Sequence, residues 1–222
     1  VVADQDPVPD PDPDPDPDPD PANTTHGGDE DALDAAAPPE GTPAYWVHQL
    51  QTGDFRQRRR ARKHLRAAGD KALPVLIARR TSADPELRST VQVLIRDIYR
   101  DRLLAGTPVP GLATQPAENK KWACKLRVTA HEPETNAITG QIAWPGLESV
   151  HKIEGAFTRT RLQFEETEAV TAGRAALNCI YVIDLRQQRG DTWEGTWHAP
   201  EGDSDHGEIR LYFQGPPADD RD

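Results

Sequence analysis

The sequence has no methionine, only two cysteines among 222 residues, and no apolar run near the roughly 18 residues that a transmembrane helix requires. So few cysteines exclude a disulfide-dense small scaffold and a four-cysteine zinc site. Gly-x-Ser-x-Gly, phosphate-loop and dinucleotide-binding motifs are also lacking. Glu165 and Glu166 are neighbours on an expected strand and point to opposite faces, which excludes an acid–base pair. We therefore expect a non-enzymatic protein without a cofactor or a bound metal.

Positive charge is missing from the first part of the chain. Residues 1–42 contain 13 acidic side chains and no Lys or Arg, whereas residues 43–105 contain 14 basic and 6 acidic ones. The net charge of −11 thus conceals an acidic, a basic and a mildly acidic part. We predict an acidic spacer over 1–41, a helical module over 42–106, a linker over 107–119, a β-module over 120–214 and a disordered tail over 215–222.

The N-terminal spacer alternates proline with aspartate between Asp6 and Pro21. Proline fixes φ and disfavours helix at the preceding residue, so we predict that residues 1–41 are disordered and extended. The opening Val1-Val2-Ala3 fits the small-residue end of a cleaved secretory signal. This favours an exported bacterial protein of the periplasm or cell envelope, held by its spacer. The alternatives are an arbitrary chain boundary and a cytoplasmic location.

Residues 42–105 are predicted to be helical, because N-capping residues precede apolar side chains at helical spacing. The strongest periodicity belongs to Leu87, Val91, Leu94 and Ile98, at i, i+4, i+7 and i+11. Three helix starts are visible: Thr42-Pro43, Asp54 with Gln57 three residues later, and Asp84-Pro85.

Three features of this part resemble a known family. They are an Asp-Phe start at residues 54–55 with arginine soon after, the core step from Ala61 to Leu65, and Asp-Pro-Glu-Leu-Arg at residues 84–88. On these features the run GDFRQRRRARKHLRAAGDKALPVLIARRTSADPELRSTVQVLIRDI resembles HEAT-like repeats. The resemblance implies antiparallel helix pairs stacked as a short right-handed solenoid and used for protein–protein contact. Fewer than three repeats bury little surface, so we predict that the helices pack on the β-module and melt with it.

A dense basic cluster lies on the helix that follows Asp54. Arg58, Arg62 and Arg66 align at i, i+4 and i+8, with Arg59 and Lys63 beside them. We predict that this row is exposed and interpret it first as a solvated helix face. Since acidic side chains are scarce within the helices, contact with an acidic partner, either the N-terminal spacer or another protein, is the alternative. Nucleic acid is not expected, because the rest of the chain is acidic.

From residue 120 the hydrophobic period changes to two and predicts seven short strands, the longest from Leu177 to Leu185. Each strand has one apolar face, so an antiparallel meander must close into a barrel or fold into a sandwich, and the fold class is α+β. The architecture loosely resembles the small calycin-like barrels of the lipocalin and avidin type. Gly140, Gly155 and Gly195 are expected to relieve crowding where strands bend.

Four tryptophans and both cysteines share the inward parity of these strands. The tryptophans form either the core or the wall of a cavity for an apolar ligand or a sugar ring. The cysteines are either buried thiols or a disulfide that closes a long loop. These residues are Trp122, Trp144, Trp193, Trp197, Cys124 and Cys179.

The sequence therefore favours a non-catalytic interaction or scaffold protein with a protein partner. A small-ligand carrier that uses the barrel interior is the alternative. A barrel filled with side chains would argue against the carrier, and an empty cavity of roughly 300 Å³ or more would favour it.

Overall fold

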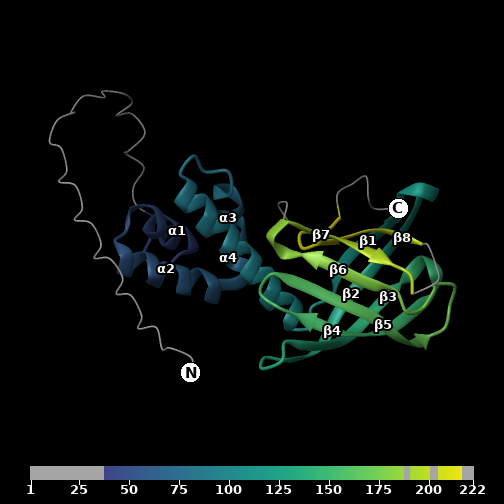
Figure 1. Ribbon diagram of the computed structural model, residues 1–222. Helices are drawn as coiled ribbons and strands as arrows, with labels where there is room; N and C mark the ends of the chain where they lie inside the picture. The colour runs from purple at the N-terminus through teal and green to yellow at the C-terminus, as the bar shows by residue number, and fades with distance from the viewer. Residues whose placement is uncertain (1–37, 188–190, 201–204, 217–222) are drawn as a thin grey trace, which may run out of the picture. The chain divides into compact units, whose positions relative to one another are not determined.

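The chain folds into four α-helices followed by a closed antiparallel β-barrel (Figure 1). The computed structural model describes residues 38–187, 191–200 and 205–216. The α+β class expected from the sequence is confirmed. The predictions of disorder for 1–41 and 215–222 fall outside the described residues, except at residues 38–41 and 215–216.

The predicted helix caps are all formed. Thr42 Oγ1 accepts the backbone N–H of Tyr45 at 3.2 Å, and Asp54 with Gln57 makes a reciprocal capping box. Asp84 accepts backbone N–H groups from the first turn of the last helix. These caps satisfy donors that a helix start leaves unpaired and so fix where each helix begins. The helices are α1 Pro43–Thr52, α2 Phe55–Ala68, α3 Leu73–Arg79 and α4 Pro85–Leu104, with the 3₁₀ turn η2 Gly69–Ala72 between α2 and α3.

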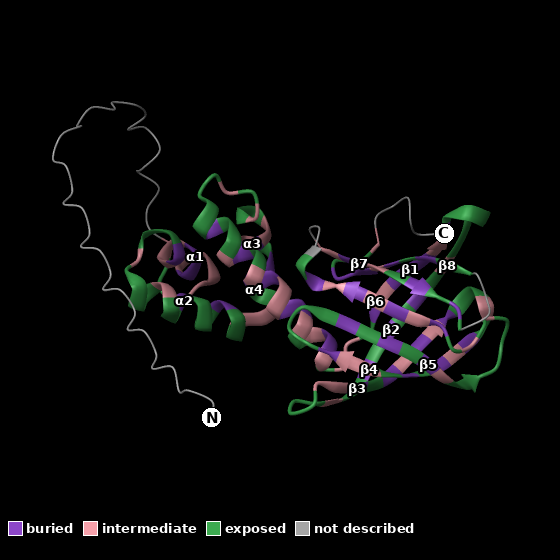
Figure 2. Ribbon diagram, in the orientation of Figure 1, coloured by how far each residue is buried: buried purple, intermediate pink, exposed green. Residues whose placement is uncertain are grey.

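The barrel consists of eight strands, each paired with the next, and β1 also pairs with β8 to close the sheet. Buried and exposed residues alternate along the strands (Figure 2). The interior is therefore packed with apolar side chains while the outer face is polar. The strands are β1 Val109–Gln115, β2 Lys120–Glu132, β3 Ala137–Trp144, β4 Ser149–Phe157, β5 Arg161–Thr171, β6 Ile180–Asp184, β7 Thr192–His198 and β8 His206–Tyr212. Short 3₁₀ turns η3 Pro116–Glu118, η4 Pro145–Leu147 and η5 Leu185–Gln187 follow β1, β3 and β6.

Strand β1 lies in the segment 107–119, which the sequence pattern assigns to a linker. Its hydrophobic signal is weak because small residues occupy inward positions, among them Gly111 and Ala113. A Cβ at Gly111 would lie 2.7 Å from the backbone oxygen of Arg210 on β8, so the closing strands need glycine here. Pairing on both sides, rather than large apolar side chains, makes this segment a strand.

Strand β6 is shorter than the strand expected from Leu177 to Leu185, and β2, with 13 residues, is the longest in the described part of the chain. Asn178 has a φ of 70°, in the left-handed region that strand residues do not adopt. The β5–β6 strand pairing therefore begins only at Ile180.

The expected role of the barrel glycines agrees with the backbone geometry. At Gly140, Gly155 and Gly195 a Cβ would lie 2.1–2.2 Å from a backbone carbonyl oxygen of the neighbouring strand. Any side chain there would push two strands apart.

The C-terminal half of α4 lies against one end of the barrel. The ring of Tyr99 stacks on Phe213, which follows β8, with centroids 4.4 Å apart, and its hydroxyl donates to Asp191 Oδ1 at 2.9 Å. Arg102 Nη1 donates to the carbonyl oxygen of Phe213 at 2.9 Å. Strands β4 and β8 run toward this end, so β1, β3, β5 and β7 finish at the opposite end, which we call the open end.

Candidate functional site

A carboxyl group and an imidazole are buried inside the barrel. Glu166 on β5 and His151 on β4 are each 1% exposed. Glu166 shares its face of β5 with buried Leu162 and Phe164, and His151 shares its face of β4 with buried Ile153. Burying a charge is costly unless it is paired and hydrogen-bonded, so the partners of these groups decide what they do.

Glu166 holds two aromatic side chains. Its Oε1 accepts hydrogen bonds from Trp144 Nε1–H at 3.0 Å and from the Tyr181 hydroxyl at 3.1 Å. Its Oε2 lies 3.2 Å from His151 Nδ1, within ion-pair distance. The two atoms do not form a hydrogen bond in this geometry, however, and neither has a hydrogen-bond partner among the described residues.

Burial dominates the electrostatics of this cluster. It raises the pKa of the Glu166 carboxyl above its usual value, although His151 and the hydrogen-bond donors oppose the shift. Burial, together with the nearby Glu166, also raises the pKa of the Tyr181 hydroxyl well above its usual value. The cluster therefore keeps Tyr181 protonated, as a donor, and makes the Glu166 carboxyl easier to protonate than an exposed one.

A cavity of about 230 Å³ lies at the open end of the barrel. Four aromatic side chains form walls: Trp122 and Trp197 meet edge to face with centroids 6.2 Å apart, and Trp144 and Tyr181 lie 6.4 Å apart. The room between them is left by small residues that also line the cavity, namely Ala113, Ala175, Ala176 and Ala199.

Three of the four aromatic walls are fixed by hydrogen bonds. Trp144 and Tyr181 line the cavity and donate to Glu166 behind them, while Trp197 Nε1–H donates to the carbonyl oxygen of Thr114 at 3.1 Å. Side chains held in this way lose little freedom when a ligand binds. Glu166 does not line the cavity, so it positions the aromatic rings and has no access to a reactant.

The rim of the cavity has charges of both signs. Lys120 pairs with Glu118, and Arg174 Nη2 donates to the carbonyl oxygen of Gly146 at 2.9 Å. Asp205 Oδ1 accepts from Gln115 Nε2 at 3.1 Å. Lys120, Arg174 and Asp205 all line the cavity, so a polar end of a ligand would find either sign of charge here.

The four inward tryptophans take both of the roles that the sequence left open. Trp122, Trp144 and Trp197 line the cavity. Trp193 is fully buried near α4 instead, edge to face with Phe157 at 5.8 Å and 4.5 Å from the ring of Phe213. Because β7 runs from α4 to the open end, Trp193 and Trp197 lie at opposite ends of one strand face.

The two cysteines are buried thiols and form no disulfide. Cys179 lines the cavity, and burial raises the pKa of the Cys124 thiol to about 12. A thiol with so high a pKa is a poor nucleophile, because the thiolate is the reactive form. Of the two alternatives drawn from the sequence, the structure has the buried thiols.

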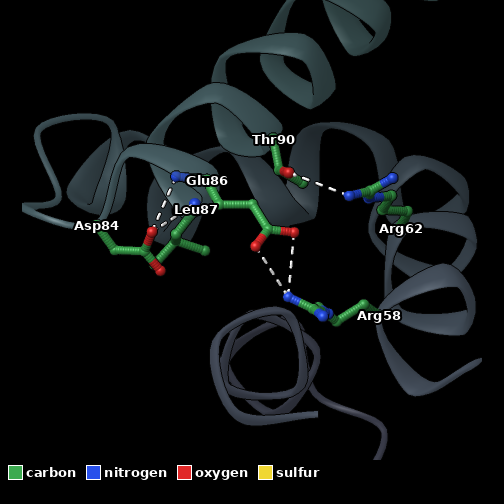
Figure 3. Close-up of polar contacts among 6 residues, drawn as sticks. All are labelled: Arg58, Arg62, Asp84, Glu86, Leu87 and Thr90. Carbon is green, nitrogen blue, oxygen red and sulfur yellow. Dashed lines mark hydrogen bonds and ion pairs between the residues drawn. The ribbon is translucent and has the colours of Figure 1, made fainter. Parts of the chain in front are cut away.

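The arginine row on α2 is paired within the chain, as Figure 3 shows for Arg58 and Arg62. Arg58 Nη1 donates to both carboxylate oxygens of Glu86 at 3.0 and 3.1 Å, and Arg62 Nη2 donates to Thr90 Oγ1 at 3.2 Å. Arg66 makes two hydrogen bonds of 2.9 Å to Asp101. Acidic side chains are scarce within the helices, as noted from the sequence, yet two on α4 lie opposite this row, where Glu86 pairs with Arg58 and Asp101 with Arg66.

Arg59 and Lys63 point elsewhere and are exposed, with no ion pair to a described residue. Between them Arg60 lies over the ring of Trp46 on α1, 5.8 Å from its centroid, and Trp46 in turn stacks on His64 at 4.0 Å. Of the predicted binding residues, only Arg59 and Lys63 therefore keep their charge available.

Comparison with protein-family models, with curated protein sequences and with solved structures finds no match for this chain. Within the described residues no three His, Cys, Asp or Glu side chains come together in a way that could hold a metal ion. Nor is any described helix both long and apolar enough to cross a membrane.

Sequence reasoning missed Glu166 and His151, although a signal was present. Glu166 continues the inward series Leu162 and Phe164, and His151 precedes Ile153 by two. A polar residue on the apolar parity of a strand must find partners inside. Glu165 and Glu166 do point to opposite faces, as expected, and the one that faces inward is the functional candidate.

Proposed function

We propose that the chain binds a small ligand bearing an apolar or aromatic ring at the open end of its barrel. The observation that carries this proposal is the cavity with four aromatic walls, two of which are anchored by the buried Glu166. Aromatic faces favour flat apolar groups, and walls fixed in advance cost little entropy on binding. Binding of this kind needs no catalytic group, and the shielded carboxyl supplies none to a reactant.

The ligand is smaller than that of a hollow barrel. The cavity of about 230 Å³ lies below the roughly 300–1,000 Å³ of ordinary ligand pockets. Beneath it the barrel is filled by buried side chains such as Ile153, Phe164 and Trp193. A ligand of about one ring with a polar end toward Lys120, Arg174 and Asp205 fits this space. The filled interior argues against a carrier that uses the whole barrel, and the proposed site is confined to the open end.

Three single-ring probes of different charge test the proposal: phenol, benzylamine and benzoate. Calorimetry at constant ionic strength should give saturable binding at one site for at least one of them. The probe that binds tightest gives the sign of charge preferred at the rim. If none of the three binds up to its solubility limit, the proposal is wrong.

Two variants localise the binding. Trp122→Ala removes a half-buried wall, and Ala176→Trp fills the cavity from an exposed position, so each should lower affinity about tenfold or more. Lys121→Ala is the matched control for Trp122→Ala, because Lys121 is the preceding residue on β2 and points outward. Loss of affinity in the control as well, or in neither cavity variant, would contradict the site.

A second candidate function is contact between α2 and an acidic polypeptide. It is supported by Phe55, which is 74% exposed at the start of α2, and by exposed basic neighbours including Arg59 and Lys63. This proposal preserves the expected interaction role of the HEAT-like helices. A synthetic Asp-Pro repeat peptide with the sequence of residues 6–21 should bind at low salt and lose affinity in Arg59→Glu/Lys63→Glu. No binding at low salt, or equal binding to the double variant, would overturn it.

A further inference from the structure

A second cleft, of about 390 Å³, lies where α3 and α4 meet the turn η5. Three arginines from these three elements line it: Arg80 after α3, Arg96 on α4 and Arg186 on η5. Thr81, Ser89 and Gln92 add hydroxyl and amide donors, and no Asp or Glu is among the described residues that line it. The wall of the cleft is therefore rich in hydrogen-bond donors and positively charged.

Arg96 is the charged side chain of the cleft that lacks a partner among the described residues. Its Nε is shielded from solvent and has no acceptor, and Arg96 makes no hydrogen bond or ion pair to any described residue. A buried donor left without an acceptor costs about 1–3 kcal/mol, and more when the group is charged. An acceptor from outside the chain would remove this cost.

Among the described arginines of the helices, only Arg96 and Arg100 have a shielded Nε without an acceptor. Arg58 and Arg66 have carboxylate partners on α4. The Nε of Arg100 also lacks an acceptor, but its guanidinium lies over the ring of Phe157, 5.3 Å from the centroid. Arg96 has no such contact, which makes it the exception among the described arginines of α4.

The other two arginines of the cleft are only partly neutralised by carboxylates. Arg80 Nη1 lies 3.7 Å from Asp191 Oδ1, which is longer than a hydrogen bond. Arg186 is paired with Asp184 by hydrogen bonds of 2.8 and 3.0 Å, yet its side chain is 70% exposed. Two carboxylates behind three guanidinium groups leave the cleft with an excess of positive charge.

We propose that this cleft binds a small, multiply charged oxyanion, the phosphate or carboxylate groups of a soluble molecule, with Arg96 as its central contact. The planar guanidinium fork matches two oxygens of such a group, and charge-assisted hydrogen bonds of this kind are the strong ones. The cleft lies at the barrel end near α4, where β6 finishes, so it is distinct from the aromatic cavity at the open end. Occupancy would join α3, α4 and the barrel through one ligand.

Titration calorimetry of the full chain tests this proposal with pyrophosphate, citrate and acetate at one ionic strength. Pyrophosphate or citrate should bind at one site and acetate far more weakly, and the tighter of the first two distinguishes phosphate from carboxylate ligands. The ¹⁵N-detected Nε–H signal of Arg96 should shift on binding. Absence of binding at millimolar concentration, or binding without a shift at Arg96, would overturn the proposal.

Matched variants distinguish binding in the cleft from a general effect of the net charge of the chain. Arg96→Gln should lower affinity about tenfold or more, whereas Arg56→Gln removes the same charge from an exposed position on α2 and should change nothing. Gln92→Glu, an exposed change that adds negative charge to the cleft, should also weaken binding and does not disturb the core. Equal losses in Arg96→Gln and Arg56→Gln would contradict the site. Trp122→Ala should leave anion binding intact, so failure of one site is told apart from failure of the other.

Discussion

At the scale of single residues, Glu166 is the side chain on which the open end of the barrel depends. One of its oxygens satisfies both the indole N–H of Trp144 and the hydroxyl of Tyr181. Removing the carboxyl leaves two buried donors without an acceptor, whereas an amide oxygen can still accept from both.

We therefore predict that Glu166→Ala lowers the free energy of unfolding by about 2–4 kcal/mol, and Glu166→Gln by much less. Urea unfolding at pH 5 would measure both, with Glu165→Ala on the outer face as the control. Equal losses in Glu166→Ala and Glu165→Ala would show that the buried hydrogen bonds do not matter.

The raised pKa of Glu166 predicts a dependence of stability on pH. The folded chain holds this proton more tightly than the unfolded chain, so unfolding releases it above the ordinary glutamate pKa of 4.5. The contribution of Glu166 to stability should be complete below pH 4.5 and decline as pH rises through the folded pKa. The stability difference between the native chain and Glu166→Gln should thus shift in favour of the variant with rising pH. A difference that is constant, or that shifts the other way, would contradict the raised pKa.

Some of these single-residue features could be predicted from the sequence, and others could not. Parity predicted correctly that Trp122, Trp144, Trp193 and Trp197 face inward. Trp122, Trp144 and Trp197 border the cavity because they lie at the end of the barrel away from α4, whereas Trp193 lies near α4. The alternation of residues along one strand does not reveal at which end of the barrel each tryptophan lies. Arg96 was not identified because its lack of a partner is a property of three elements that meet.

At the scale of elements, α2 and α4 are joined by a row of polar contacts. Arg58, Arg62 and Arg66 reach partners 28 to 35 residues away in the sequence. Local periodicity predicted that the three arginines share one helix face, and the caps predicted where the helices begin. Which residues of α4 pair with these arginines depends on how the two helices pack, and a local sequence pattern does not reveal this.

Charge reversal tests this row. Arg58→Glu/Arg62→Glu/Arg66→Glu places acids against Glu86, Asp97 and Asp101, so the free energy of unfolding should fall by about 2 kcal/mol at low salt. The loss should shrink at about 1 M salt, where exposed charges are screened. Reversal of Arg56, Arg59 and Lys63, the matched control on the same helix, should leave stability nearly unchanged. If the triple reversal lowers the free energy of unfolding no more than its control does, the three arginines do not stabilise the packing of α2 against α4.

Sequence patterns place most strands correctly, and the two failures have backbone causes. Strand β1 has small inward residues and is defined by pairing on both sides, while Asn178 shortens β6 through its left-handed backbone. The pairing of β1 with β8 closes the barrel, and a strand considered alone does not reveal it.

At the scale of the whole molecule, α4 belongs to both the helices and the barrel. Tyr99 stacks on Phe213 and donates to Asp191, and Arg127 on β2 donates to the carbonyl oxygen of Gly106 after α4 at 3.1 Å. We expect four helices of this size to depend on this contact for their stability, so it should couple them to the barrel.

We predict a single unfolding transition for the described helices and barrel. Circular dichroism in the helical band and tryptophan fluorescence should give the same midpoint in urea. Tyr99→Phe should lower the free energy of unfolding by about 1 kcal/mol and Tyr99→Ala by about 3–5 kcal/mol, with both signals moving together. Two separate midpoints, in the native chain or in Tyr99→Ala, would contradict the coupling.

The central claim is that the open end of the barrel binds a small ringed ligand. The most direct test follows the indole N–H signals of the five tryptophans by ¹H–¹⁵N NMR while the full chain is titrated with the tightest of phenol, benzylamine and benzoate. We predict that the signals of Trp122, Trp144 and Trp197 shift together with one dissociation constant, while Trp46 on α1 and Trp193 near α4 stay in place. Saturable binding that leaves the three cavity signals unmoved, or that shifts all five alike, would contradict the claim.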